Sequence, residues 1–130
     1  MARTNLPVTN LVANSGVALS TTAVDQANGM NLQLASSAIP AASTSESLVL
    51  VVANTAASPF NVIIRAGASN PPAFRAGLGD ITVSVTNATT KYLGPFDYAR
   101  VVQSDGSLNI DFGVGFTGTI QALLVPGSTN

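Results

Sequence analysis

The chain contains no histidine, no cysteine and no tryptophan among its 130 residues. Without cysteine it can form neither a disulfide nor a thiolate metal site. Without histidine it lacks the commonest general base and metal ligand, and no histidine-activated nucleophile can be assembled within one chain. These absences predict a protein that is not an enzyme and holds no cofactor.

Charge is also scarce. Only 8% of the residues are charged, and five basic and six acidic residues leave a net charge of −1, whereas a typical soluble domain carries about 25% charged residues. Such a surface offers little electrostatic repulsion against packing on a partner protein. The five cations are spread along the chain, so they do not make the concentrated basic face that nucleic acid requires.

Long hydrophobic runs are missing too. The longest apolar run, residues 48–53, is the length of a strand, well short of the roughly 18 apolar residues of a membrane span. The first residues lack the apolar core of a signal peptide. We therefore expect synthesis in a cytoplasm and no membrane partner.

From residue 46 onward, short β-branched runs alternate with turn residues, a pattern typical of a sandwich or barrel. We expect strands at residues 47–53, 60–65, 80–86, 91–93, 98–103, 107–112 and 117–125. The first run is apolar on both faces and predicts a central strand, and Asp105-Gly106 predicts a tight hairpin. The fold class predicted for residues 46–130 is all-β, a single antiparallel β-sandwich or jelly-roll-like domain.

Residues 1–45 differ in character, because apolar residues are dotted singly or in pairs through a polar stretch rich in Ala, Ser, Thr and Asn. Ordering a backbone costs about 1–2 kcal/mol per residue, which so sparse an apolar set can offset only on a preformed surface. This stretch is predicted to be an extended N-terminal arm with one or two added strands, at residues 17–21 and 31–34. The arm would dock on its own sandwich or on a neighbouring subunit.

Few residues suggest chemistry. The lone lysine, Lys91, is expected to solubilise an edge strand. A carboxylate pair could be drawn from Asp80, Asp97, Asp105 and Asp111. Of these, Asp80 is expected at a strand entry, Asp105 in the hairpin turn and Asp111 on the solvent face of its strand. Residues 113–118 have the letters of a dinucleotide fingerprint, but a strand rather than a helix should follow them, so we expect turn glycines.

Seven stretches carry a resemblance to a known group of proteins: RTNLPVTNL (3–11), NGM (28–30), LVLVVANT (48–55), RAG (65–67), PPAFRAGLGD (71–80), GPF (94–96) and QSDG (103–106). In this layout the chain resembles small head decoration (capsid cement) proteins encoded by actinobacterial phages and prophages. The resemblance implies a sandwich or jelly-roll domain with an N-terminal arm, located on the virion at the capsid surface. It implies binding to the major capsid protein and no catalytic residue.

Partner binding is expected in the arm and in the proline-stiffened loop at 69–75, since aromatic residues and arginine are enriched at interfaces. The predicted partner-binding residues are Arg3, Leu6, Pro7, Val8, Leu11, Phe74 and Arg75. For Phe74, burial in the core stays an alternative. The expected partners are the major capsid protein and other copies of the chain, as a monomer or trimer on the shell, with no small-molecule substrate.

Two other functions fit the same fold. One is a tail-tube or head-completion component, and the other is a glycan-binding module for the host surface. The second needs aromatic platforms, and aromatic residues make up only 5% of the chain.

Overall fold

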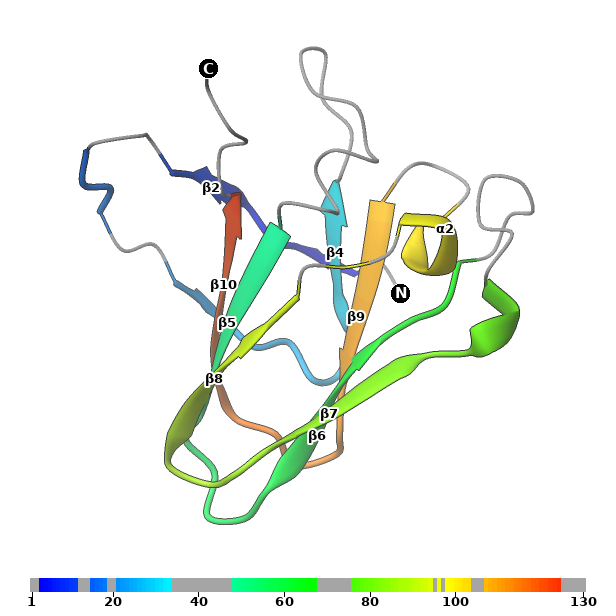
Figure 1. The fold of residues 1–130 in the computed structure, drawn as a ribbon. Helices are drawn as coiled ribbons and strands as arrows, with labels where there is room; N and C mark the ends of the chain where they lie inside the picture. The colour runs from blue at the N-terminus through cyan, green and yellow to red at the C-terminus, as the bar shows by residue number, and fades with distance from the viewer. Residues whose placement is uncertain are drawn as a thin grey trace.

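The computed structural model describes residues 3–11, 15–18, 21–33, 48–67, 76–94, 96, 98–103 and 107–124. Two sheets pack face to face (Figure 1). Sheet A has the strand order β1 (Thr4–Asn5), β4 (Met30–Gln33), β9 (Ser107–Phe112), β6 (Phe60–Ile64) and β7 (Ile81–Val85). Sheet B has the order β2 (Val8–Asn10), β10 (Gly118–Leu124), β5 (Leu48–Asn54) and β8 (Thr89–Leu93), and β3 (Thr22–Ala23) also pairs with β10. The prediction of an all-β sandwich is confirmed.

Strand β5 is central, as its two apolar faces predicted. It lies between β10 and β8, and burial alternates along it. Leu48, Leu50 and Val52 are fully buried. They point between the sheets because successive side chains of a strand face opposite sides.

The alternation predicted for two strands of sheet A is also confirmed. In β7, Val85 is buried while Thr82 and Ser84 are exposed. In β9, Ile110 is fully buried and Asp111 lies on the outer side. Each strand therefore buries one face in the core and exposes the other to solvent.

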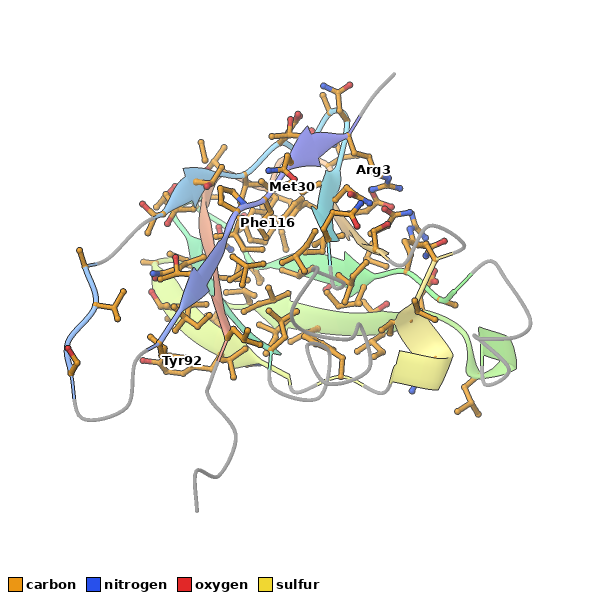
Figure 2. The ribbon with its side chains drawn as sticks, turned by 90° about the horizontal axis from the view of Figure 1, so that it is seen from above. Arg3, Met30, Tyr92 and Phe116 are labelled. Carbon is orange, nitrogen blue, oxygen red and sulfur yellow. The ribbon has the colours of Figure 1, made fainter. Side chains whose placement is uncertain are left out.

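The core lies between the sheets, where Met30 and Phe116 are seen in Figure 2. Phe116 packs at 5.2 Å from Phe112 and at 6.4 Å from Phe60, measured between ring centroids. Both ring pairs are tilted, an arrangement that aromatic quadrupoles favour over a face-to-face stack. These rings pack together at the end of the core where the chain passes from β9 to β10.

The strand predicted at residues 98–103 is wrong. Residues Tyr98–Val101 form a single helical turn, α2, and a 3-10 turn, η1, covers Ala76–Leu78. Val101 and Val102 are both fully buried. Consecutive valines in a strand would face opposite sides, so the helical turn is what lets both enter the core as the chain passes from β8 in sheet B to β9 in sheet A.

The outcome differs for the other local predictions. The residues of the predicted Asp-Gly hairpin turn, 104–106, lie outside the described residues. Gln103 N–H donates to the Ser107 carbonyl at 2.8 Å, which closes that connection. The strand predicted at 17–21 is not found at residues 17, 18 and 21, and the strand expected at 31–34 is β4.

The sheets are mixed rather than purely antiparallel. Strand β1 runs parallel to β4, and β2 runs parallel to β10, with Thr4 opposite Met30 and Val8 opposite Ala122. The other strand pairs are antiparallel. Hairpins force antiparallel neighbours, but the first strands reach partners remote in the chain and are under no such constraint. This strand order does not confirm a jelly roll.

Between β1 and β2 the chain crosses from one sheet to the other. Leu6 lies at this crossing with only 2% of its surface exposed, and it belongs to the core. The Leu6 N–H donates to the Asn31 carbonyl at 2.9 Å, and the Leu11 N–H donates to the Leu124 carbonyl at 3.0 Å. Residues 3–11 are thus docked on their own sandwich.

Candidate interaction surface

The outer face of sheet B is the surface that we single out. The register places Val51 between Gln121 and Tyr92, and Ala53 beside Thr119 and Thr90, with side chains on the same side of the sheet. Ten residues share this side: Thr9, Ala23, Val49, Val51, Ala53, Thr90, Tyr92, Thr119, Gln121 and Leu123. None of the ten is charged. We call this set the sheet B face.

The sheet B face is unusually apolar for an outer surface. Val49, Val51 and Leu123 are half-buried, Tyr92 is 74% exposed, and Gln121 is only 5% exposed. The solvent side of an antiparallel sheet normally carries polar residues. A contiguous apolar patch rimmed by polar side chains marks a site of protein contact.

The outer face of sheet A has the opposite character. Asn31, Asn109 and Asp111 line it, and the Asn31 amide donates to Ser107 Oγ at 2.8 Å and to Asn109 Oδ1 at 2.7 Å. Ile63 is the one large apolar side chain that the strand register places on this side. Figure 2 shows Arg3 and Tyr92 on opposite sides of the sandwich. Charge and apolar area are therefore segregated between the two faces.

An ion network ties the N-terminal segment to sheet A. Arg3 Nη1 and Nη2 donate to the two carboxylate oxygens of Asp111 at 2.6 and 3.2 Å, and Arg65 Nε donates to the same carboxylate. Arg65 Nη1 also reaches Asp80 Oδ2 at 2.8 Å. Both aspartates are held by arginine, so neither is a free carboxyl for acid–base chemistry.

Burial raises the pKa of Asp111, but the hydrogen bonds from Arg3 and Arg65 together outweigh burial and hold that pKa below its usual value. A backbone hydrogen bond from Ala66, followed by the Arg65 contact, likewise lowers the pKa of Asp80. The hydrogen bond to Asp111, followed by the one to Asp80, raises the pKa of Arg65. The network is thus stable as a set of charged groups at neutral pH.

Acid should weaken the fold through Asp111. Its folded pKa lies below the unfolded value of about 3.9, so its stabilisation is fully present above that value and is lost as the pH falls through the folded pKa. Asp111→Asn is expected to lower the free energy of unfolding by about 1.5–3 kcal/mol at neutral pH. Urea unfolding at a series of pH values measures both effects.

The control for this prediction is Asp80→Asn. The Asp80–Arg65 pair is more exposed, with 36% and 43% of the side-chain surfaces accessible, and an exposed pair contributes about 0–1 kcal/mol. The loss should therefore be smaller. An Asp111→Asn variant with the same stability and the same acid sensitivity as the parent protein contradicts the role given to the network.

Lys91 protects an edge of sheet B. Strand β8 ends the strand order of this sheet, and Lys91 stands opposite Val52, in the row that faces the other sheet. It is exposed, and its Nζ donates to the Ser84 carbonyl of β7 at 3.0 Å. A charge pointing inward at an edge strand discourages pairing with another chain. The predicted position of Lys91 on an edge strand is confirmed.

The structure places the arm residues predicted to bind a partner in different surroundings. Leu6 is in the core of its own chain, so its side chain cannot contact a partner while the fold is intact. Arg3 is engaged by Asp111. Pro7 is exposed, and Val8 and Leu11 are half-buried along the β2 margin of sheet B. Partner binding by the last three stays a prediction.

The two loop residues, Phe74 and Arg75, lie outside the described residues. The sheet B face, by contrast, was missed at the level of sequence. Its signal was the apolar residues at every position of 48–53, which we interpreted only as a mark of a central strand. Val49 and Val51 show that such a strand can also expose an apolar outer face.

Within the part of the chain that the structure describes, no three carboxylates gather as a metal-binding group, and no helix is long and apolar enough to cross a membrane. Comparisons of the chain with models of protein families, with curated proteins and with solved structures find no match. The function of the protein is therefore inferred from the surfaces of the chain and from the resemblance in its sequence.

Proposed function

We propose that this protein is a structural component of a phage virion, a capsid decoration or cement protein that binds the outer surface of the major capsid protein lattice and stabilises the head. The observation that carries the proposal is the sheet B face, whose ten residues include no charge. When such a face docks on another protein, none of its own side chains is a charged group that must lose its water. Association therefore avoids, on this side of the contact, the cost of burying ions.

The margin of sheet B supports the same function. Pro7 is exposed, and Val8 and Leu11 are half-buried beside β10. Because backbone hydrogen bonds hold this segment on the sandwich, it needs little further ordering to meet a partner, which lowers the entropic cost of binding. Many modest contacts repeated by the symmetry of a shell add up to strong reinforcement.

The test is binding to purified phage heads that lack the protein. The expected result is saturable co-sedimentation, with a copy number that scales with the number of shell subunits. Quantitative mass spectrometry of washed particles measures it, and bovine serum albumin serves as the control for trapping. Absence from the pellet contradicts the proposal.

The same experiment separates the two alternatives. A handful of copies per particle, located at one vertex or on the tail, indicates a head-completion or tail-tube component instead. Binding to host cells but not to heads indicates a glycan-binding module. Among the described residues, Tyr92 is the one strongly exposed aromatic side chain, which leaves little platform for a sugar.

A further inference from the structure

We propose that Asn28 is a deamidation site, which the docked N-terminal segment keeps closed and which opens when residues 3–5 leave sheet A. This inference goes beyond the proposed function and does not depend on it. Asn28 and Gly29 form the one Asn-Gly pair in the chain. Because glycine has no Cβ, no side chain of its own crowds the approach of its backbone nitrogen to the asparagine side chain.

The reaction needs no reactant other than water. The backbone nitrogen of Gly29 attacks Cγ of the Asn28 side chain, and the new N–C bond closes a cyclic succinimide. The side-chain nitrogen leaves as ammonia, which carries away the proton that the backbone nitrogen gives up. Water then opens the ring at either carbonyl. The product is an aspartate at position 28, joined to Gly29 through its α-carboxyl or, in the isoaspartyl form, through its side chain.

In the folded chain both reacting groups are held by Asp25. The Gly29 N–H donates to the Asp25 carbonyl at 2.9 Å, and Gly29 is buried. The Asp25 carboxylate accepts from the Asn28 N–H at 3.1 Å and from Asn28 Nδ2 at 3.2 Å. The nitrogen that must attack thus has its proton engaged, and the amide that must leave is fixed in place.

The N-terminal segment closes over this turn. The Thr4 N–H donates to the Gly29 carbonyl at 3.1 Å, and the Thr4 hydroxyl donates to the Asp25 carboxylate. The paired groups of Arg3 and Asp111 fill the space that a Cβ on Gly29 would take. Residues 3 and 4 therefore clamp the turn at 25–29, and ring closure has the freedom it needs only when they lift away.

The product does not fit the closed turn. Asn28 Oδ1 is buried and has no hydrogen-bond partner, so no donor stands ready for a carboxylate there. Deamidation also replaces the Nδ2 donor by a charge beside the Asp25 carboxylate, and like charges at one site repel. The isoaspartyl form adds a methylene to the backbone just before Gly29, which displaces the carbonyl that Thr4 binds. The conversion therefore keeps residues 3–5 from docking again.

Two substitutions in the segment test the inference. Arg3→Ala removes the pair with Asp111, and Thr4→Val removes the hydroxyl that donates to Asp25. Peptide mapping by mass spectrometry, after incubation at mildly alkaline pH, measures the fraction of residue 28 in the aspartyl and isoaspartyl forms. Thermal melts show which variants are folded during the incubation, and Thr4→Val decides alone if Arg3→Ala is not.

Val85→Ala is the control for a general loss of stability. Val85 is fully buried in β7, which lies at the opposite end of sheet A from β1, so its truncation leaves a cavity in the core without touching the clamp. The parent protein unfolded in urea gives the rate at which the open site converts.

The folded parent protein is expected to convert at least tenfold more slowly than the same chain in urea. Arg3→Ala and Thr4→Val should each convert at least threefold faster than the folded parent protein, and Val85→Ala should not. Equal rates in the folded and unfolded chain, or no conversion in either, overturn the inference. So does equal acceleration by Val85→Ala, because global unfolding and not release of the segment would then open the site.

Asn28→Asp tests the effect of the product on docking, with Asn87→Asp as the control that adds the same charge at an exposed turn. Amide hydrogen exchange at Thr4, whose N–H binds Gly29, should become at least tenfold faster in Asn28→Asp and stay unchanged in Asn87→Asp. Unchanged exchange in both variants contradicts the coupling between Asn28 and the segment.

Discussion

Replacing Gly118 by alanine is expected to lower the free energy of unfolding by about 3 kcal/mol or more. Gly118 begins β10 with φ of +148°, a conformation that side chains rarely adopt. A Cβ at this position would lie 1.9 Å from the carbonyl oxygen of Ala53 and 3.0 Å from its carbon. Both are backbone atoms of β5, the central strand, so they cannot swing aside as a flexible side chain could.

The clash acts at one end of the central strand pair of sheet B. Gly118 stands opposite Asn54 at the start of the longest antiparallel ladder among the described strands, so relief requires β10 to move away from β5. Loss of that pairing would also disturb β2 and β3, which are held by β10. Chemical denaturation followed by circular dichroism measures the loss.

Gly77→Ala is the matched control. Gly77 lies in the exposed turn η1, its φ is outside the positive region, and no atom lies within 4 Å of a Cβ built there. Its substitution should change the stability by no more than about 0.5 kcal/mol. If Gly118→Ala is as stable as Gly77→Ala, then the close approach of β10 to β5 is wrong.

Replacing Leu6 by alanine is the second large effect, with an expected loss of about 2–5 kcal/mol in the free energy of unfolding. Leu6 is 2% exposed and lies in the same core cluster as Met30 and Leu32. Removing its side chain leaves a cavity between the two sheets where the chain crosses from β1 to β2. Thermal and urea unfolding of the purified variant measure this loss.

Pro7→Ala is the control, because the neighbouring residue is exposed and should cost little stability. The pair separates a structural role from a partner-binding role. If Leu6 anchored a free arm on a partner, Leu6→Ala would leave the stability of the isolated protein unchanged and reduce only its occupancy on heads. Unchanged stability therefore contradicts the burial of Leu6 in its own core.

Docking of residues 3–11 changes how the arm can be tested. Deleting this segment would remove β1, β2 and the Arg3 contact with Asp111 together, so lost binding could not be separated from lost folding. Substitutions at exposed or half-buried positions such as Pro7 and Leu11 keep the strands and probe the surface alone.

Much of the sandwich could be predicted from local pattern. The period-two alternation of Ile81, Val83 and Val85 places one face of β7 toward the core whatever the rest of the chain does, because neighbouring side chains in a strand point to opposite sides. The apolar run that became β5 predicted a central strand, and β5 indeed pairs with β10 along one edge and with β8 along the other. The prediction of a strand at residues 98–103 failed because a single helical turn is too short to leave a periodic signal in the sequence.

By itself the sequence determined the all-β class, the central place of β5 and the inward faces of β7 and β9, since each follows from residues a few positions apart. Only the tertiary structure decided where residues 3–11 lie, because β1 and β2 pair with strands that are distant in the chain. It also decided the sheet B face. That surface is assembled from five strands whose outward residues become neighbours through register alone, and no local pattern encodes that register.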